Sequence, residues 1–328
     1  MMILSGDVGG TNTRLALVEV DGSMPRITVH RDRPSADYDS LNEVVTSFVE
    51  EIDADFEAVC FGIPGPVHSG KIRTTNLPWV VDRDQLVRSL GVPVILVNDL
   101  EAAAWSLPVL GENDLVSVRD GDGSAHGNRA LISPGTGLGV AGLYWDGSEH
   151  LPFASEGGHA DFGPSDAFER DLLADLGEDF DHVSWERVVS GPGLVAIHEF
   201  LQARRGERHP SCPAQCDDGD RAPSEITRAA RQGLCPVCVE AVERFCRLLG
   251  AHAGNAALMF LATGGLWIGG GIAPNIVDQI LQGEFERGFL AKGRLREVME
   301  RIPVWIITDD HAAVRGAARR AAHEVRRS

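Results

Sequence analysis

The sequence predicts an α/β protein with two domains, and three observations lead to this prediction. The chain has 328 residues, of which 43% are hydrophobic, and a chain of this size more often builds two cores than one. Short apolar runs alternate with stretches of helical periodicity, which is the order typical of α/β domains. The opening pattern of two apolar runs joined by a glycine-rich turn also recurs near residue 130, which indicates two related halves.

The first half opens with a predicted β-hairpin. Residues 1–8 and 13–20 are apolar, β-rich runs that are joined by a glycine-rich turn. A helix is expected at 39–52, where apolar residues recur at helical spacing. The segments EAVCFGIPGPV and PVILVNDL each indicate a buried strand, and the second of them ends in polar residues.

The second half starts with another predicted hairpin, ALISPGTGLGVAGLYWDG, which begins at Ala130. Residues 206–223 are polar and typical of a loop, and the segment VWIIT predicts a strand near the end of the chain. Helices are expected at about 191–204, 236–259 and 310–325.

Composition and charge argue against several classes of function. The net charge is -18 and no Lys/Arg-rich run occurs, whereas nucleic-acid binding depends on basic patches that release counterions. No apolar run reaches the roughly 18 residues that span a bilayer, and the first residues lack the features of a signal peptide. We therefore expect a cytoplasmic protein that binds neither nucleic acid nor membrane. Its six cysteines are expected to be thiols rather than a disulfide framework.

Two glycine-rich turns are candidate phosphate sites. The first contains Asp7, Gly9, Gly10, Thr11 and Asn12, and the second contains Gly135, Thr136 and Gly137. Glycine allows several backbone N–H groups to converge on one phosphate, and threonine hydroxyls add donors. Each turn alone could be a tight hairpin turn, but the pair favours a polyphosphate that is held from two sides. Asp7 could then hold Mg²⁺, directly or through water.

Two familiar nucleotide motifs are absent from the sequence. A Walker A loop needs Gly-Lys-Ser/Thr, and neither Lys71 nor Lys292 stands in such a context. A dinucleotide fingerprint also fails, because GTGLG has the wrong glycine spacing and leads into a strand-like segment rather than a helix.

Polar side chains that could bind a polyol lie in three segments. Asn98 and Asp99 stand where an apolar strand gives way to a predicted helix, the position at which open α/β sheets present ligand-binding groups. Glu156 and His159 follow in SEGGHADFGP, and Glu186 lies in SWERVVSGPG. Carboxylates, amides and imidazole can all hydrogen-bond neighbouring hydroxyls. Asn-Asp could instead only cap the helix, and the Glu–His pair could bind a metal, although further ligands at metal spacing are missing.

Seven segments, in order along the chain, resemble the bacterial glucokinases of the sugar kinase, Hsp70 and actin superfamily. They are GDVGGTNTRLAL, NLPW, VNDLEAAAWSLP, SPGTGLGVAGL, EGGHADFGP, ERVVSGPGL and GGGIAPN. The resemblance covers nearly the whole chain and implies the two-domain actin-like ATPase (ribonuclease H-like) fold. A small α/β domain, 1–108 plus 311–328, and a large α/β domain, 109–310, would flank a cleft. The implied activity is ATP-dependent phosphorylation of D-glucose at its 6-hydroxyl, which yields glucose 6-phosphate and ADP.

The resemblance also implies which residues bind the sugar. Asp99 would be the general base. The side chains that would hold sugar hydroxyls are those of Asn98, Glu156, His159 and Glu186. Asn76, in the segment NLPW, is expected near the sugar as well.

The nucleotide would be bound by the glycine-rich turns. The transferring phosphate would face Gly9, Gly10, Thr11 and Asn12. The rest of the polyphosphate would meet Thr136 and Gly137, and the nucleoside would meet Gly270 and Gly271. Asp7 would hold Mg²⁺, directly or through water.

Other functions are compatible with all or part of this pattern. A kinase for another hexose or for an N-acetylhexosamine would keep every motif, since only the shape of the pocket separates these substrates. A non-catalytic sugar sensor of the same fold is disfavoured because Asp99 and both phosphate turns are intact. An actin-like polymer-forming ATPase is disfavoured because the polar groups of EGGH and ERVVSGPG would have no sugar to bind. Glucose and ATP are thus the expected small-molecule partners, and a homodimer is the expectation from the family.

The remaining cysteines leave two interpretations open. Cys212, Cys216, Cys235 and Cys238 could form a four-thiolate zinc site. The segment CPVC, followed by Cys246, also resembles a helix-start pattern of these glucokinases that needs no metal. The tight Cys-x-Cys-Gly zinc motif of the related repressor-kinase family is absent, and we favour the metal-free interpretation.

Overall fold

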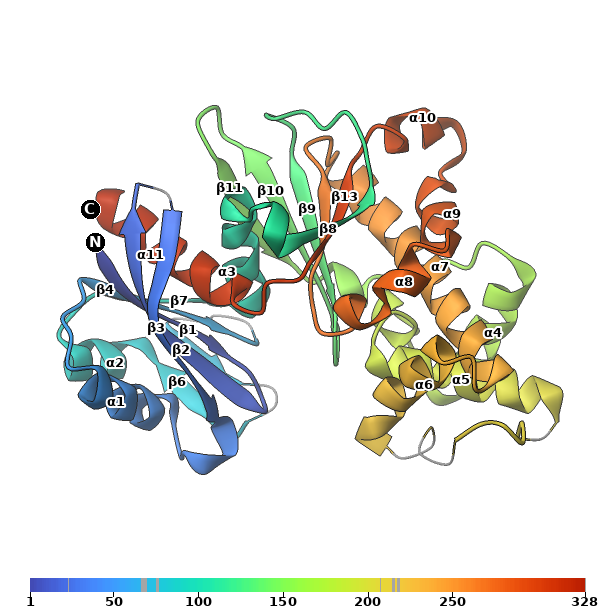
Figure 1. Cartoon of the computed structure of the whole chain (residues 1–328), viewed down its shortest axis with the longest axis horizontal. Coiled ribbons are helices and arrows are strands. Elements are labelled where there is room, and N and C mark those ends of the chain that lie inside the picture. The colour runs from blue at the N-terminus through green and yellow to red at the C-terminus, as the bar shows by residue number, and fades with distance from the viewer. Residues whose placement is uncertain are drawn as a thin grey trace. The chain divides into compact units, whose positions relative to one another are not determined.

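The computed structural model describes residues 1–22, 24–65, 70–74, 77–206, 208–213, 216 and 219–327. The chain divides into two compact units. The first unit comprises residues 1–114, 150–154 and 309–328, and the second comprises residues 115–149 and 155–308. Each unit contains a mixed β-sheet with helices packed on it, which confirms the prediction of two α/β domains (Figure 1). The domain limits at 108/109 and 310/311 stay a prediction.

The sheet of the first unit has the strand order β3-β2-β1-β4-β7. Its strands are β1 (Met2–Val8), β2 (Asn12–Asp21), β3 (Met24–Pro34), β4 (Ala58–Ile63) and β7 (Val94–Asn98). The predicted opening hairpin is present, because β1 and β2 pair antiparallel, while β1, β4 and β7 run parallel. A separate short ladder joins β5 (Lys71–Arg73) to β6 (Val80–Asp82).

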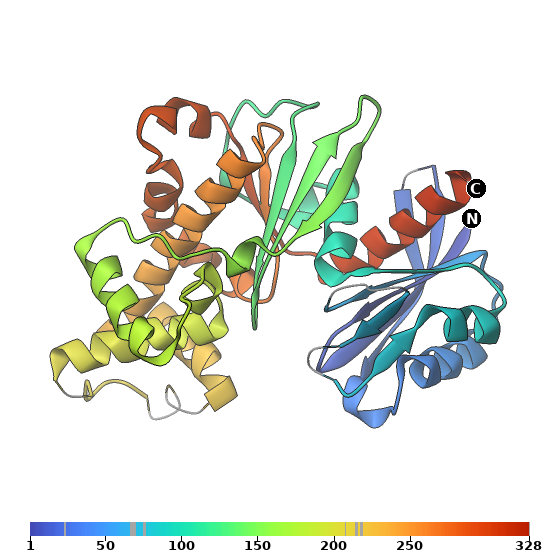
Figure 2. The same cartoon turned by 180° about the vertical axis from the view of Figure 1, so that it is seen from behind.

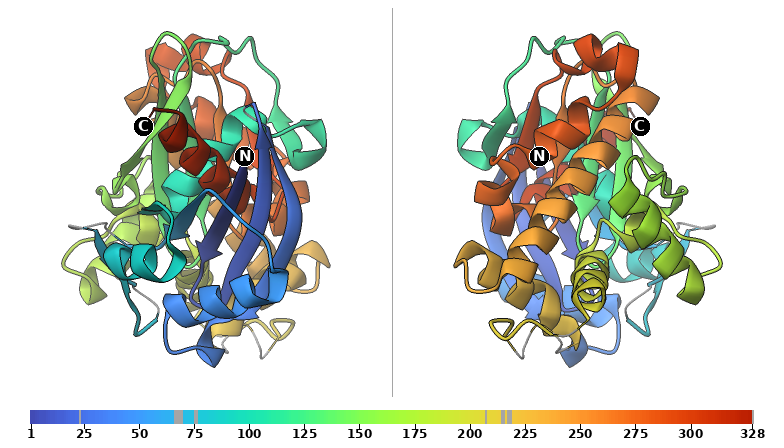
Figure 3. Two further views of the ribbon diagram at one scale, coloured as in Figure 1. Left: turned by 90° about the vertical axis from the view of Figure 1, so that its left-hand side faces the viewer. Right: turned by 90° about the vertical axis from the view of Figure 1, so that its right-hand side faces the viewer.

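Strands β1, β2, β4 and β7 are mostly buried, which explains why they contain apolar runs, whereas the edge strand β3 is largely exposed. Successive side chains of a strand point to opposite faces, so Ile3 and Leu4 belong to different clusters. Helices α1 (Leu41–Ile52) and α2 (Arg83–Leu90) supply the cluster around Leu4, and α3 (Asp99–Ser106) and α11 (Ala312–Arg327) supply the cluster around Ile3. Figure 1 and the left panel of Figure 3 show these helices on the two sides of the sheet.

The packing of α11 against α3 requires a glycine. A Cβ atom on Gly316 would lie 1.8 Å from the carbonyl oxygen of Ala102 and 2.8 Å from the backbone nitrogen of Ser106. We expect Gly316→Ala to lower the free energy of unfolding by ~1–3 kcal/mol or more, because backbone cannot yield as a side chain can. The change is measured by urea denaturation.

The control for this substitution is Gly177→Ala in α4 (Ala167–Asp179). No atom lies within 4 Å of a Cβ built on Gly177, and alanine favours helix over glycine by ~1 kcal/mol. This variant should be as stable as the parent or more so. Equal destabilisation by both substitutions would contradict the close approach of α11 to α3.

The strands of the second unit follow the order β10-β9-β12-β13-β8. Their bounds are Leu115–Arg119 (β8), Arg129–Pro134 (β9), Leu138–Trp145 (β10), Leu266–Ile268 (β12) and Val304–Ile307 (β13). The predicted second hairpin is formed by β9 and β10, and β12 runs parallel to both β9 and β13. Strand β11 covers His150–Ser155, and its first five residues are grouped with the first unit.

Most of the helices of the second unit gather in one bundle. The α-helices described in this unit are α4, α5 (Gly191–Arg205), α6 (Ala222–Arg231), α7 (Pro236–Met259), α8 (Val277–Ile280), α9 (Glu284–Leu290) and α10 (Arg296–Met299). Helix α7 is the long central element, and α5, α6 and α9 pack against it (Figures 2 and 3). The expected helices at 191–204, 236–259 and 310–325 correspond to α5, α7 and α11. Among the helices of the described residues, none has the combined length and apolarity that a membrane crossing needs.

Candidate functional site

The first glycine-rich turn is a tight connection between β1 and β2 that is fixed by Ser35. The backbone nitrogen of Gly9 donates to the carbonyl of Asn12 (2.9 Å), and a Cβ on Gly9 would lie 2.8 Å from that oxygen. Ser35 donates from its hydroxyl to the carbonyl of Gly9 (2.8 Å) and from its backbone nitrogen to the carbonyl of Thr11 (2.9 Å). Thr11 and Asn12 are exposed. The turn is therefore rigid at its base and presents its outer residues to solvent.

The parallel strands bring Asp7 to the same sheet edge as Asn98 and Asp99. Asp7 is level with Gly62 of β4, and Gly62 is level with Val97 of β7. Parallel strands end at the same edge, so the glycine-rich turn after β1 lies on the side where α3 begins with Asp99. A Cβ on Gly62 would lie 2.7 Å from Cβ of Ala102. Glycine at this position therefore lets the start of α3 approach β4.

The carboxylate of Asp7 is held in an unfavourable environment. Burial raises its pKa from the ordinary 3.8 to about 6, and the nearby carboxylate of Asp99 also raises it. Arg14, whose Nη1 lies 3.2 Å from Oδ2 of Asp7, lowers that pKa in part. Two carboxylates at one edge, with a single arginine on Asp7, form a donor set that suits a divalent cation.

Asn98 and Asp99 both take part in the start of α3. The amide oxygen of Asn98 accepts from the backbone nitrogens of Leu100 (2.9 Å) and Glu101 (3.4 Å), so Asn98 is the N-cap. Oδ1 of Asp99 also accepts from the nitrogen of Leu100 (2.9 Å). Asn98 therefore caps α3, which is the alternative that the sequence left open. The cap fixes the position of the Asp99 backbone at the sheet edge.

The second glycine-rich turn, between β9 and β10, contacts Glu186. The backbone nitrogen of Gly135 donates to the carbonyl of Gly137 (2.8 Å), and Thr136 is exposed at the tip. Oε2 of Glu186 accepts from the backbone nitrogen of Leu138 (2.9 Å). A Cβ on Gly137 would lie 2.6 Å from the same oxygen, so a larger residue there would displace the carboxylate.

Three of the predicted sugar-binding residues meet in the second unit. Nδ1 of His159 lies 3.9 Å from Oε1 of Glu186, and its Nε2 lies 4.0 Å from Oε2 of Glu156. His159 ends the short 3-10 helix Gly157–His159, and Glu186 lies in the 3-10 helix Trp185–Arg187. The backbone nitrogen of Trp185 donates to the carbonyl of Ala160 (3.0 Å), which ties the two segments together.

The three side chains differ in exposure. Glu156 and His159 have exposed fractions of 79% and 58%, whereas that of Glu186 is 27%. Glu186 is also the one that holds a backbone hydrogen bond. Its carboxylate is therefore the best-fixed acceptor of the group, and Glu156 and His159 remain accessible to a ligand.

Gly270 and Gly271 follow β12, which ends beside β9. Gly270 has φ +76°, and a Cβ on it would lie 2.3 Å from the carbonyl oxygen of Pro134. The conformation and the close approach both require glycine. Because β12 and β9 are parallel, this loop lies at the edge where Gly135–Gly137 also stands. The side-chain nitrogen of Asn275 donates to the carbonyl of Gly271 (2.7 Å) and fixes the loop.

The glucokinase family profile matches residues 4–324 of the chain. The chain belongs to the glucokinase family. It is thus a hexose-phosphorylating transferase. The glucokinase of Aromatoleum aromaticum is 39% identical over 318 residues, which cover 96% of this chain and 93% of the relative. The glucokinase of Caulobacter vibrioides is 36% identical over 319 residues, which cover 96% and 93% of the two chains.

Solved glucokinase structures share the fold. A glucokinase from an Antarctic psychrotroph superposes with a TM-score of 0.87 at 30% identity, over 98% of this chain and 99% of that chain. A ROK family glucokinase from Streptomyces griseus, solved in complex with glucose and AMPPNP, superposes with a TM-score of 0.68 at 22% identity, over 98% and 100% of the two chains. The expected actin-like sugar kinase fold is confirmed.

Some site residues of this glucokinase were not found from its sequence. Arg14 comes from strand β2 and Ser35 from the turn after β3, and neither was predicted from the sequence as a partner of Asp7 or Gly9. The register of the predicted hairpin was the signal that could have found Arg14, because it sets Arg14 directly opposite Asp7. Asn76, which the resemblance placed near the sugar, lies outside the described residues.

The predicted cysteine set is corrected at one position. The sulfur atoms of Cys212, Cys216 and Cys238 and a ring nitrogen of His198 all lie within 4.8 Å of one another, and Cys235 is not a member of this group. Cys235, the N-cap of α7, still contacts the thiols of Cys212 and Cys238. His198 comes from α5, and a lone histidine in a helix gave no signal in the sequence.

Proposed function

We propose that the chain transfers the γ-phosphate of ATP to the 6-hydroxyl of D-glucose, with Asp99 as the general base. The observation that supports this best is the register of β1, β4 and β7, which sets Asp99 at the same sheet edge as Asp7 and the first glycine-rich turn. A base and a phosphate-binding turn at one edge are what transfer to an alcohol requires.

The sugar hydroxyls are held, in this proposal, by four side chains. They are Asn98, Glu156, His159 and Glu186, with Asn76 as a further contact. A carboxylate can accept from two neighbouring hydroxyls, and imidazole can donate or accept. The hydrogen bond from the Leu138 nitrogen to Glu186 supports this role, because a pre-positioned acceptor loses little freedom when the sugar binds.

The nucleotide is held by the two glycine-rich turns and by the loop after β12. Gly9, Gly10, Thr11 and Asn12 face the transferring phosphate, Thr136 and Gly137 face the other phosphates, and Gly270 and Gly271 face the nucleoside. Backbone N–H groups and threonine hydroxyls donate to phosphate oxygens. Asp7 would hold Mg²⁺, which when bound supplies positive charge to the phosphates.

The chemistry asks for positioning more than for covalent participation. Phosphoryl transfer passes through a loose transition state, so the residues act mainly by aligning the 6-hydroxyl with the phosphate. Asp99 accepts the hydroxyl proton as the new bond forms. The backbone of the first turn donates to the oxygens on which charge accumulates.

The remaining expectations rest on the resemblance alone. A homodimer and a cytoplasmic location are proposals of this kind. A kinase for another hexose or for an N-acetylhexosamine is the nearest alternative, because it would use the same turns and the same base.

The proposal is tested by measuring ADP release from MgATP with glucose, mannose, fructose, N-acetylglucosamine or no sugar. We expect strong release with glucose and little with the other sugars. Faster turnover with another sugar would assign that sugar as the substrate. Folded protein that binds glucose without sugar-stimulated ADP release would instead be a sensor, and the proposed reaction would be wrong.

A further inference from the structure

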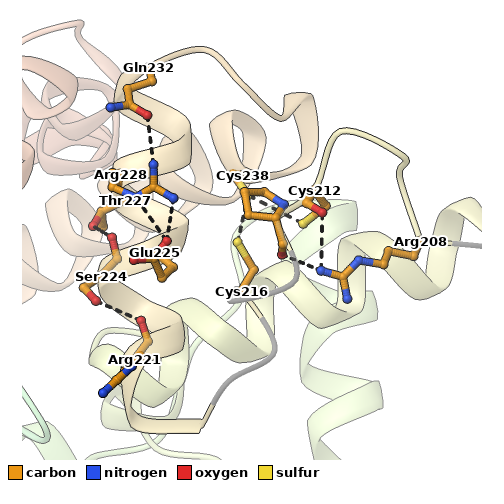
Figure 4. Close-up of polar contacts among 11 residues, drawn as sticks. Arg208, Cys212, Cys216, Arg221, Ser224, Glu225, Thr227, Arg228, Gln232 and Cys238 are labelled. Atoms are coloured by element: carbon orange, nitrogen blue, oxygen red, sulfur yellow. Dashed lines mark hydrogen bonds and ion pairs between the residues drawn. The ribbon is translucent and has the colours of Figure 1, made fainter.

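Four metal-binding side chains converge inside the second unit, and none of them is a residue proposed for catalysis. His198 comes from α5, Cys212 and Cys216 come from the segment that follows α5, and Cys238 comes from the first turn of α7. All four side chains are buried, and their ligand atoms lie within 4.8 Å of one another. Figure 4 shows the three thiols pointing toward one another.

The distances between these atoms match a tetrahedral metal site rather than a disulfide. Sγ of Cys238 lies 3.9 Å from Sγ of Cys212 and 3.7 Å from Sγ of Cys216. A disulfide would need about 2.05 Å. Zinc–sulfur bonds of about 2.3 Å at tetrahedral angles give sulfur–sulfur distances of about 3.8 Å. Nε2 of His198 lies 3.2 Å from Sγ of Cys212, a few tenths of an ångström inside the about 3.6 Å that the same geometry gives for nitrogen and sulfur.

We propose that Nε2 of His198 and the sulfur atoms of Cys212, Cys216 and Cys238 bind a structural Zn²⁺. Three thiolates and one imidazole are among the ligand sets that structural zinc sites use. Soft sulfur ligands in a closed four-ligand set favour zinc over magnesium or calcium. All four positions are filled by protein, so the site is structural rather than catalytic.

The other ring nitrogen of His198 is positioned for this role. Nδ1 lies 3.3 Å from the side-chain amide of Gln202, one helical turn further along α5. When Nε2 binds zinc, Nδ1 carries the ring proton and can donate it to the amide oxygen of Gln202. Rotation of the Gln202 amide exchanges its oxygen and nitrogen, so the oxygen can accept this hydrogen bond when zinc is bound.

The zinc would fasten the segment after α5 to the helical bundle. This segment has few apolar side chains, and Cys212 and Cys216 are buried members of the core cluster there. Arg208 donates to the carbonyls of Cys212 and Pro213, which folds the segment back on itself. The metal would add a covalent link from this segment to α5 and α7 beside the apolar contacts of Cys212 and Cys216.

Two further cysteines of α7 provide comparison variants. Cys235 is the N-cap of α7, and Cys246 lies within the helix. Both are buried free thiols outside the group of four ligand atoms, but the thiol of Cys235 contacts those of Cys212 and Cys238. Cys246→Ser is the matched control, because it changes the same atom as Cys238→Ser in the same helix without removing a proposed ligand. Cys235→Ser tests whether the neighbouring thiol is a ligand.

The test is elemental analysis of the full chain, purified without added metal, beside the variants His198→Ala, Cys238→Ser, Cys235→Ser and Cys246→Ser. We expect about one equivalent of zinc in the parent, in Cys235→Ser and in Cys246→Ser, and a loss of at least tenfold in the other two. Removal of the zinc by a chelator should lower the Tm of the parent and leave that of Cys238→Ser unchanged.

A second measurement does not depend on the folding of any variant. Parent protein loaded with Co²⁺ should show the intense visible bands of tetrahedral cobalt and the near-ultraviolet absorption of thiolate ligation. Less than about a tenth of an equivalent of zinc in the parent, together with a cobalt spectrum of octahedral type, would overturn the proposal. Zinc lost in Cys235→Ser but kept in His198→Ala would overturn the ligand set. None of these readouts depends on the sugar that the enzyme phosphorylates.

Discussion

Asp99→Asn is expected to lower kcat by about 10² to 10⁴-fold, with a much smaller effect on the KM for glucose. The substitution removes the proton acceptor and keeps the shape of the side chain. Oδ1 of Asp99 accepts from the backbone nitrogen of Leu100, and an asparagine oxygen can make the same bond. The start of α3 should therefore stay intact. Steady-state kinetics with MgATP and glucose give kcat and KM separately.

The control for this prediction is Glu101→Gln, which removes a neighbouring carboxylate from the same helical turn. Burial raises the pKa of Glu101 as well, so this variant tests whether the loss of any half-buried acid of α3 affects turnover. We expect kcat to change by less than about threefold. Near-normal turnover in Asp99→Asn would remove Asp99 from the role of base. Equal losses in both variants would indicate damage to the helix.

Asp7→Asn is expected to lower kcat/KM for MgATP by about 10²-fold or more, while it stabilises the free protein at neutral pH. Activity falls because the proposed ligand of Mg²⁺ loses its charge. Stability rises because the folded protein no longer carries a buried carboxylate whose pKa is about 6. The expected gain near pH 7 is on the order of 1–3 kcal/mol.

The sign of the pH dependence follows from the raised pKa of Asp7. The folded state binds the carboxyl proton more tightly than the unfolded state, whose pKa is near 3.8. The contribution of Asp7 to stability is therefore most favourable below 3.8 and is lost as the pH rises to about 6. The advantage of Asp7→Asn over the parent should grow across that range and level off above it. Thermal unfolding at a series of pH values measures it.

Asp32→Asn is the control for Asp7→Asn. Asp32 also faces Arg14, at 3.7 Å from its Nε, but the side chain of Asp32 is 52% exposed. The substitution Asp32→Asn should change activity and the free energy of unfolding very little, because exposed ion pairs usually contribute little. If Asp7→Asn were less stable than the parent at neutral pH, the pairing with Arg14 would outweigh the burial. The proposed environment of Asp7 would then be wrong.

Much of the fold could be predicted from local patterns. The opening hairpin and the hairpin at Ala130 were predicted because apolar runs on both sides of a glycine-rich turn favour strand pairing whatever surrounds them. Helices α5 and α7 were placed within a residue or two because their apolar spacing extends over many turns. The short helix α6 was missed, because it begins inside the polar segment 206–223 and has no side-chain cap.

The sequence by itself determined the glycine-rich turns, the acids that follow strands and the family resemblance, because each of these depends on neighbours along the chain. Only the tertiary structure decided which side chains meet. The parallel pairing of β1, β4 and β7 sets Asp7 beside the start of α3, and the packing of α5 against α7 brings His198 to the thiols of Cys212, Cys216 and Cys238. These contacts join residues far apart in the chain, and they are fixed by strand order and helix packing, for which local periodicity carries no information.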